Sequence, residues 1–248
     1  MIEAILPPTI HSFDAFGDPP DAVLLPAEEE LVRQVAEKRR REFTTARHCV
    51  RKAMERLGLP PVPILPGAHG EPRWPPGLIG SITHCDGYRA AAVAAVGGTV
   101  GIDAEPDAPL PPGVEEAVTL PEERKMLRRL ASEHPGVSWD RLLFSAKESV
   151  YKAWFPLTRR WLDFQDAAIV LDPERGAFHA RLMAPGPRWR GRQLTGFHGR
   201  WTVGRGLLLT AIALIEPAPS TASTASIASI VPSASVPRPG LRAGGASP

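Results

Sequence analysis

Two short stretches of the chain carry acidic and basic side chains in a pattern suited to phosphate chemistry. An apolar run ends in Asp103 and Glu105, and a later stretch places Glu148 between two lysines, Lys147 and Lys152. Because alternate residues of a strand share a face, Asp103 and Glu105 project together. Carboxylate oxygens suit a hard divalent cation such as Mg²⁺, which keeps water and phosphate oxygens as its remaining ligands. The pattern therefore predicts a metal site for a phosphate compound, closed by Glu148 from a helix.

Each stretch also has an explanation without a metal. Pro106 and Asp107 follow the two acids, which is typical of a solvated strand end before a turn. On a helix, Glu148 and Lys152 stand in the favourable order for an ion pair, so the second stretch is also compatible with ordinary helix surface. We favour the metal site because both stretches occur in order beside further unusual residues.

Three motifs together resemble a known family. The Gly-Ile-Asp-Ala-Glu run at residues 101–105 and the Phe-Ser-Ala-Lys-Glu-Ser-Val-Tyr-Lys run at residues 144–152 resemble the two signature motifs of 4′-phosphopantetheinyl transferases. Residues 70–75 and 80–85 are similar to an upstream motif of the enterobactin-synthase component D branch and its actinobacterial relatives. The resemblance spans roughly residues 26–215, and it is specific because three spaced motifs match in order.

The resemblance implies an enzyme that modifies carrier proteins of fatty-acid, polyketide and siderophore assembly lines. Such an enzyme moves the 4′-phosphopantetheine group of coenzyme A to a serine of an apo acyl or peptidyl carrier protein and releases 3′,5′-ADP. Mg²⁺ is the expected metal and Mn²⁺ the alternative, held by Asp103, Glu105 and Glu148. Lys147 and Lys152 are expected to offset negative charge in the reaction, and Glu148 is the preferred general base, directly or through a water.

A second set of residues is expected to bind the coenzyme. Arg39 and Arg47 flank Phe43 at helical spacing, so guanidinium groups, which grip phosphate oxygens with paired donors, lie on an otherwise apolar helix side. The alternative is a solvated charge run and, for His84, a hydrogen-bonded structural role. In the family, the residues around the 3′-phosphate and adenosine of coenzyme A match Arg39, Arg47, Thr83 and His84.

One loop departs from the family. Relatives commonly carry a lysine in the loop that here spans residues 65–70, where it approaches the phosphates of the coenzyme. This loop offers His69 as its one possible cation. Either His69 substitutes for the lysine or other basic residues supply the charge.

Composition narrows the class of protein. The chain has 248 residues, of which 43% are hydrophobic and 23% charged, so it can bury a sizeable core as one domain or two packed halves. A net charge of +2 argues against a dedicated nucleic-acid binder. With no signal-like opening and no apolar run near the ~20 residues that span a bilayer, we expect a cytoplasmic protein that binds neither nucleic acid nor membrane. We expect a monomer if two halves of the chain already form the active-site cleft.

The expected fold class is α+β. A Pro-rich extended segment should lie on the core, followed by a long or twice-broken helix from Pro26 to Leu57 whose buried side includes Leu31 and Val35. Further helices are expected at residues 121–130 and 139–154, the second capped by Ser138 and ending before Pro156. Expected strands cover residues 78–83, 90–96, 100–103, 167–171, 177–183, 199–203 and 207–215.

The resemblance implies two similar α+β halves related by a pseudo-twofold axis, with the active site in the cleft between them. The expected N-terminal half, residues 1–106, binds coenzyme A and metal. The expected C-terminal half, residues 107–216, carries the catalytic helix and the docking surface for the carrier protein. Residues 217–248, rich in Pro, Ala, Ser and Thr, are expected to form a disordered tail.

Two other classes of function are weighed against the transferase. A different metal-dependent, phosphate-cleaving hydrolase would use similar acids and lysines, but it needs a positioned water or a nucleic-acid surface. A non-catalytic coenzyme A-binding protein would be expected to lack one of the three acids, and all three are present.

Carrier proteins are typically acidic, so their docking surface is expected near basic side chains and the exposed-looking Trp161. The basic residues are Arg124, Lys125, Arg128, Arg129, Arg159 and Arg160.

Overall fold

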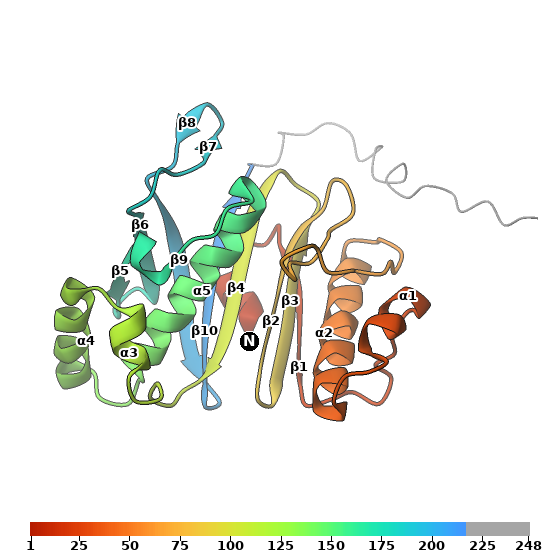
Figure 1. The fold of residues 1–248 in the computed structure, drawn as a ribbon, viewed down its shortest axis with the longest axis horizontal. Helices are drawn as coiled ribbons and strands as arrows, with labels where there is room; N and C mark the ends of the chain where they lie inside the picture. Colours follow the sequence, from red (N-terminus) through yellow and green to blue (C-terminus); the bar gives the residue numbers. More distant parts are fainter. Residues whose placement is uncertain (217–248) are drawn as a thin grey trace, which may run out of the picture. The chain divides into compact units, whose positions relative to one another are not determined.

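The computed structural model describes residues 1–216 (Figure 1). The predicted tail, residues 217–248, lies outside the described residues. The described part combines helices with antiparallel sheets, which confirms the predicted α+β class. None of its helices is both long and apolar enough to cross a membrane.

The N-terminal sheet has three antiparallel strands in the order β1-β3-β2. Their bounds are β1 His11–Phe16, β2 Ile79–Cys85 and β3 Tyr88–Ala94. Helix α2, Glu37–Arg56, covers one face of this sheet through Cys49, Val50 and Ala53, which meet the strand residues Ala91 and Val93. The chain reaches α2 through two short turns of helix, α1 Pro26–Glu29 and η2 Glu30–Val32.

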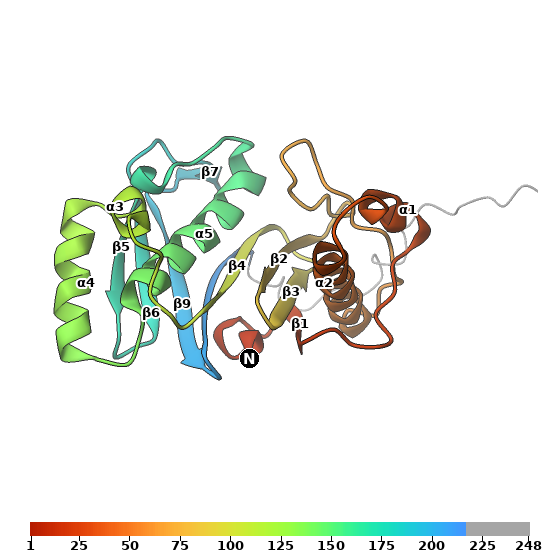
Figure 2. The same ribbon diagram turned by 60° about the horizontal axis from the view of Figure 1, so that its bottom comes forward.

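The second sheet has five antiparallel strands in the order β4-β10-β9-β6-β5. Their bounds are β4 Gly98–Pro106, β5 Ala167–Asp172, β6 Ala177–Leu182, β9 Gly196–Gly204 and β10 Leu207–Ile215. Figures 1 and 2 show α5, Trp139–Thr158, crossing one face of this sheet, with α4 farther out. The other elements of this part are α3 Val114–Val118, α4 Pro121–Glu133, η3 Phe164–Asp166 and the small ribbon of β7 Arg188–Trp189 with β8 Arg192–Gln193.

The two sheets meet where β2 runs beside β4, and hydroxyl groups make the connection. The backbone N–H of Ile102 donates to the Ser81 hydroxyl at 3.1 Å, and that of Ala104 donates to the Thr83 hydroxyl at 3.0 Å. The N-terminal turn η1, Ile2–Ile5, packs against both sheets. Strand β4 therefore lies at the centre of the molecule, next to β2 on one side and β10 on the other.

The predicted domain boundary at residues 106 and 107 coincides with the end of β4. This strand comes from the predicted N-terminal half, and it pairs along its whole length with β10 of the predicted C-terminal half. The twofold relation between the halves and the division into residues 1–106 and 107–216 stay predictions.

The predicted helix from Pro26 to Leu57 is broken, as expected, but its first turns do not bury the side chains assigned to its apolar face. Leu31 and Val35 are each 40% exposed. The buried N-terminal anchor is instead Glu28, whose carboxylate accepts from the N–H groups of Leu25 and Ile64. Glu28 therefore caps the short helix α1, and its hydrogen bonds hold this helix where apolar packing was expected to do so.

The N-terminal segment is extended, as expected, but it contains a strand, β1, that pairs with β3 and was not predicted. Helix α5 runs through Pro156 to Thr158, so the prediction that it ends before the proline is wrong. Pro156 lies in the last turn, where only one helical hydrogen bond is lost, and burial of Trp154 and Phe155 holds that turn in place. Ser138 occupies the N-cap position without a capping bond from its side chain.

Gly101 sets the distance between β4 and α5. A Cβ at Gly101 would overlap the carbonyl oxygen of Ser149 and lie 2.8 Å from the backbone nitrogen of Ala153. Because both obstacles are backbone atoms, α5 must move to admit a methyl group. We expect Gly101→Ala to lower the free energy of unfolding by about 2 kcal/mol or more, measured by urea denaturation. Gly204→Ala is the control, because its nearest contact would be the Met1 methyl at 3.4 Å; an equal loss in both variants would contradict the packing argument.

Candidate active site

Strand β4 presents two different faces. Val100, Ile102 and Ala104 point into the apolar core beneath the N-terminal turn. The alternate positions face α5: the Thr99 hydroxyl donates to the carbonyl of Ala153 at 2.8 Å, and Asp103 bonds to side chains of the same helix. The period-two pattern read from the sequence is therefore present in the structure.

Asp103 is buried and held at both oxygens. Its Oδ1 accepts from Lys152 Nζ at 2.7 Å and from the Thr83 hydroxyl at 3.2 Å. Its Oδ2 accepts from the Ser145 hydroxyl at 2.8 Å. The carboxylate is thus fixed by β2 on one side and by α5 on the other. Thr83, which was expected to contact the coenzyme, uses its hydroxyl to join Asp103 and the β4 backbone.

Glu105 also faces α5, where Arg141 binds it. Arg141 donates to Glu105 Oε2 at 3.0 Å and to the carbonyls of Ala108 and Pro109. Sequence reasoning missed this arginine. The signal was available, because Arg141, Ser145 and Lys152 fall on one stripe of α5 at spacings of four and seven residues.

Glu148 joins the same cluster electrostatically. Burial raises the pKa of Glu148, the charge of Asp103 raises it further, and Lys152 opposes the shift. Burial and Asp103 likewise raise the pKa of Glu105, against the effect of Arg141. The structure therefore brings Asp103, Glu105, Glu148 and Lys152 into one region, as the two motifs predicted.

The cluster fits a divalent cation by its chemistry. Within residues 1–216 no three His, Cys, Asp or Glu side chains are already arranged to hold a metal ion, and Lys152 and Arg141 occupy oxygens of Asp103 and Glu105. Asp103 raises the pKa of both Glu105 and Glu148, so the three carboxylates form a site with excess negative charge, which an added cation would relieve. Their oxygens match the preference of Mg²⁺ or Mn²⁺ for hard ligands.

Lys147 lies elsewhere. It is 3% exposed, and its ammonium pairs with Glu123 of α4 at 2.8 Å and donates to the carbonyl of Phe164 at 2.7 Å. Burial lowers the pKa of Lys147, while Glu123 opposes this. The structure does not bring the Lys147 ammonium to the carboxylate cluster, in contrast to the role predicted for it.

Arg39 and His84 lie together, as predicted for the coenzyme site. Arg39 Nη1 and His84 Nε2 are 2.9 Å apart, and since a guanidinium only donates, the imidazole accepts at this nitrogen. Burial and the charge of Arg39 lower the pKa of His84, and Lys152 adds to the shift. Glu42 lies 3.8 Å from Arg39 and 3.9 Å from His84. The pair is thus half-exposed, close to Lys152, and next to the carboxylate cluster.

Arg47 is more deeply placed than its predicted partners. Its guanidinium stacks on Phe43, donates to the carbonyl of Ile64 at 2.9 Å and lies 3.8 Å from the buried Glu28. Burial lowers the pKa of Arg47 to about 10, Glu28 opposes the shift, and the group stays charged at neutral pH. Its contacts within the described residues are structural, and Arg39 is the more accessible cation.

A pocket of about 310 Å³ opens beside Glu148 on the α5 side. Its lining is mostly apolar and aromatic; the lining residues are Lys147, Glu148, Tyr151, Trp161, Leu162, Asp163, Phe164 and Ala167. Trp161 is 74% exposed, and its ring lies 5.0 Å from that of Tyr151. The exposed His69 lies in the loop that departs from the family. Its ring packs against that of Phe155 on α5, with 5.6 Å between the ring centroids. Glu148 therefore has a largely hydrophobic recess as a neighbour.

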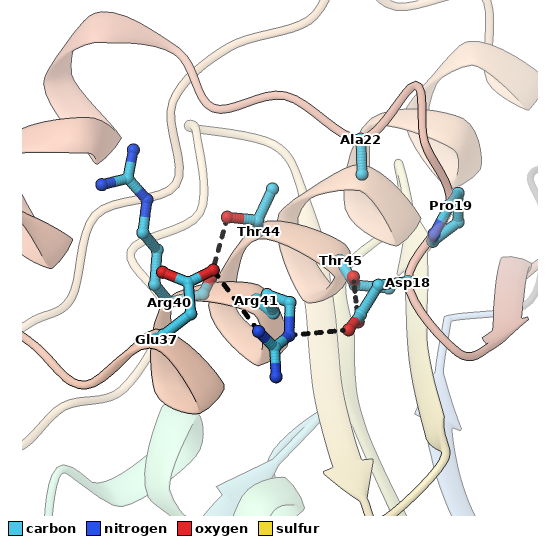
Figure 3. A pocket seen from close by; sticks show the side chains of 8 residues that line it. All are labelled: Asp18, Pro19, Ala22, Glu37, Arg40, Arg41, Thr44 and Thr45. Atoms are coloured by element: carbon cyan, nitrogen blue, oxygen red, sulfur yellow. Dashed lines mark hydrogen bonds and ion pairs between the residues drawn. The ribbon is translucent and has the colours of Figure 1, made fainter.

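A second pocket, of about 190 Å³, lies over the start of α2 (Figure 3). Arg41 lies between Asp18 and Glu37, 3.5 Å from each, and the Thr45 hydroxyl donates to Asp18 at 2.7 Å. Figure 3 shows Arg40 pointing away from this group. Since its acids and Arg41 satisfy one another, this pocket is a poor candidate for binding a charged substrate.

The fold and the site together suit a protein that binds a phosphate compound. Comparison with known proteins specifies the family: residues 27–94 match the 4′-phosphopantetheinyl transferase N-terminal domain, and residues 99–204 match the 4′-phosphopantetheinyl transferase superfamily. The chain belongs to this superfamily, and it is an enzyme, a 4′-phosphopantetheinyl transferase.

Named relatives support the assignment over most of the chain. The 4′-phosphopantetheinyl transferase Svp of Streptomyces mobaraensis is 54% identical over 223 residues, which cover 88% of this chain and 91% of the relative. The 4′-phosphopantetheinyl transferase PptT of Mycobacterium tuberculosis is 46% identical over 224 residues, covering 86% and 98%. Enterobactin synthase component D of Salmonella typhi is 35% identical over 136 residues, covering 54% and 56%. The resemblance to both branches is thereby confirmed.

Proposed function

We propose that this enzyme transfers the 4′-phosphopantetheine group of coenzyme A to a serine of an apo acyl or peptidyl carrier protein in a Mg²⁺-dependent reaction. The observation that carries the proposal is the meeting of Asp103, Glu105 and Glu148 with Lys152, beside the Arg39–His84 pair. The carboxylates with Lys152 suit a metal-bound pyrophosphate, and the Arg39–His84 pair suits the 3′-phosphate of coenzyme A.

In the proposed reaction the serine oxygen attacks the phosphorus that bears pantetheine. The bond from this phosphorus to the bridging oxygen of the pyrophosphate breaks, and 3′,5′-ADP leaves. Glu148 takes the serine proton, directly or through a water. Lys152 places positive charge beside Asp103, where it offsets charge on the transferred group. A Mg²⁺ held by Asp103, Glu105 and Glu148 would supply Lewis-acid stabilisation of the phosphate oxygens.

The pocket beside Glu148 is suited to the pantetheine arm. This arm is long, uncharged and partly apolar, and the recess is lined mostly by aromatic and aliphatic side chains. Placing the arm there puts its phosphate end next to Glu148. The exposed Trp161 at the same pocket is suited to meet the carrier protein as it delivers its serine. The basic residues predicted to border this docking surface keep that role as a proposal.

The pathway is a further part of the proposal. The name of one relative, enterobactin synthase component D, favours carrier proteins of siderophore assembly, and the family resemblance adds polyketide and fatty-acid synthesis. We expect a monomeric, cytoplasmic enzyme whose partners are coenzyme A and the carrier protein, without nucleic acid or membrane.

The decisive experiment is mass spectrometry of apo carrier proteins after incubation with the purified chain, coenzyme A and Mg²⁺. The transferase adds phosphopantetheine to one serine and releases 3′,5′-ADP only when a carrier protein is present. A hydrolase of the same site would release 3′,5′-ADP without a carrier protein. A non-catalytic coenzyme A-binding protein would release none, so the three classes give three different results.

Arg39 is expected to determine the preference for the 3′-phosphate. In Arg39→Ala the guanidinium beside His84 is lost, and with it a contact that coenzyme A makes and dephospho-coenzyme A lacks. We expect the ratio of kcat/KM for coenzyme A over dephospho-coenzyme A to fall about tenfold or more, the size of one charge-assisted hydrogen bond. Steady-state kinetics with both donors and one carrier protein measure it.

Arg40→Ala is the matched control for this prediction. The two arginines are neighbours in the first turns of α2, but Arg40 lines the second pocket. Figure 3 shows Arg40 pointing away from the ion pairs that Arg41 makes in this pocket. Its removal should leave the donor ratio unchanged. Equal donor ratios in Arg39→Ala and the wild-type enzyme would move the 3′-phosphate site to other residues. Arg47→Ala is a poorer variant, because it would leave Glu28 buried with one cation fewer.

A further inference from the structure

A chain of three buried hydroxyl groups ends on the Asp103 carboxylate. Ser145 Oγ lies 2.8 Å from Asp103 Oδ2 and 2.9 Å from Thr210 Oγ1. Thr210 Oγ1 lies 2.6 Å from Ser149 Oγ and 2.9 Å from the Ser145 carbonyl oxygen. All three hydroxyl side chains are fully buried. The chain joins β4, α5 and β10 at the point where Asp103 must keep its orientation.

The carboxylate fixes the direction of these hydrogen bonds. An ionised Asp103 only accepts, so Ser145 must give its single proton to Oδ2. The single Thr210 proton must then point toward Ser145, where it is shared between the hydroxyl and carbonyl oxygens, each 2.9 Å from Thr210 Oγ1. Because the Thr210 proton is used there, Ser149 must donate to Thr210. The order of donation is therefore Ser149 to Thr210 to Ser145 to Asp103, and each hydroxyl depends on the one before it.

Thr210 is the fixed point of this chain. It is the cross-strand partner of Asp103 in the β4–β10 ladder, so its Cα position relative to Asp103 is set by backbone hydrogen bonds. Its side chain is β-branched, which restricts rotation about χ1. A serine on a helix has more freedom, and Ser145 is restrained here by contacts with Thr210 at both its hydroxyl and its carbonyl.

Simple packing does not account for the chemistry of these positions. Alanine and valine would fill the space between α5 and the sheet without burying polar atoms that must be paired. A complete buried hydroxyl network instead specifies one arrangement. Its end point is the Asp103 oxygen that Lys152 and Thr83 leave unused, since both of these bond to Oδ1. The network therefore holds the carboxylate plane while Oδ1 faces Lys152.

We propose that Thr210 is a positioning residue for Asp103, acting through the hydroxyl of Ser145, and that it sets the affinity of the carboxylate cluster for a divalent cation. The proposal rests on the metal site of the proposed function. Partners that orient a metal ligand commonly contribute 10- to 100-fold to metal affinity, roughly the effect expected here. Thr210 itself touches neither substrate nor metal.

The test is the effect of Mg²⁺ on thermal unfolding, without coenzyme or carrier protein. A cation that binds the folded state raises the unfolding temperature in a concentration-dependent way, which gives an apparent Kd. Thr210→Val keeps the shape of the side chain and removes its hydroxyl. We expect its apparent Kd for Mg²⁺ to rise about tenfold or more, and Thr210→Ser to restore the wild-type value. Ser145→Ala, which removes the last donor, is a second variant with the same expected weakening.

Thr99→Val is the matched control. Thr99 is also a buried threonine at the interface with α5, and its hydroxyl bonds to the Ala153 carbonyl without touching Asp103. It should lose thermal stability while keeping the apparent Kd for Mg²⁺. An unchanged Kd in both Thr210→Val and Ser145→Ala, with a wild-type chain that binds Mg²⁺, would overturn the positioning role alone. A wild-type chain whose unfolding does not respond to Mg²⁺ would overturn the metal site itself, and this proposal with it.

Discussion

Asp103→Asn should reduce kcat by about 10³-fold while leaving the fold intact, because it removes charge at the centre of the site. Asparagine has the shape of aspartate and keeps an oxygen that can accept from Ser145 or Lys152. The lost charge, however, weakens both the attraction for a divalent cation and the pairing with Lys152. Steady-state transfer to an apo carrier protein at saturating coenzyme A and Mg²⁺ measures kcat, and thermal unfolding with and without Mg²⁺ measures the loss of metal binding.

Glu148→Gln should have an effect of similar size, since the same change removes a proposed metal ligand and the proposed base. Because the carboxylates act as one unit, the double variant should be little worse than either single variant. Glu116→Gln, an exposed acid on α3, is the control and should match the wild-type enzyme. Turnover of Asp103→Asn close to the wild-type value would rule out the cluster as the catalytic site.

The placement of Asp103 and Glu105 could be read from the sequence because a strand has a strict period of two. Once Val100, Ile102 and Ala104 are assigned to the core, the intervening positions must face the other way. Local patterns of this kind need no knowledge of which elements pack together.

The partners of these residues could not be read in the same way. Thr210 meets Asp103 only because β10 returns to pair with β4 from more than one hundred positions away in the chain. Nothing local to Thr210 distinguishes it from other threonines of strands. Arg141 is an intermediate case, because its position on the α5 stripe was visible, whereas the carbonyls of Ala108 and Pro109 that fix it lie in an irregular loop.

Lys147 shows how adjacency in a motif misleads. Neighbouring residues of a helix point about 100° apart, so Lys147 and Glu148 cannot both face β4. The motif contains both residues, but it does not say which side of α5 each one serves. In the structure Glu148 joins the carboxylate cluster, whereas Lys147 pairs with Glu123 of α4. Glu123 lies outside the motif, so the motif could not reveal this pair.

The two lysines of α5 should therefore respond differently to the same substitution. In Lys147→Met the aliphatic stem is kept, but Glu123 is left buried and has only the N–H groups of Leu120 and Ile169 as donors. Loss of one partner of a buried ion pair costs about 3 kcal/mol or more. For a domain of this size, that loss lowers the unfolding temperature by about 6 to 12 °C.

Lys152→Met should instead lower kcat by about 10²-fold or more, since this ammonium is partly exposed and faces the site. Thermal unfolding and kcat are measured for both variants at 20 °C or below, where Lys147→Met is still folded. There Lys147→Met should keep kcat within about threefold of the wild-type value, because its charge acts on α4 rather than on the phosphates. A large loss of kcat in Lys147→Met with an unchanged unfolding temperature would return this lysine to the catalytic role that its motif predicted, and would mean that the Glu123 pair opens when substrate binds.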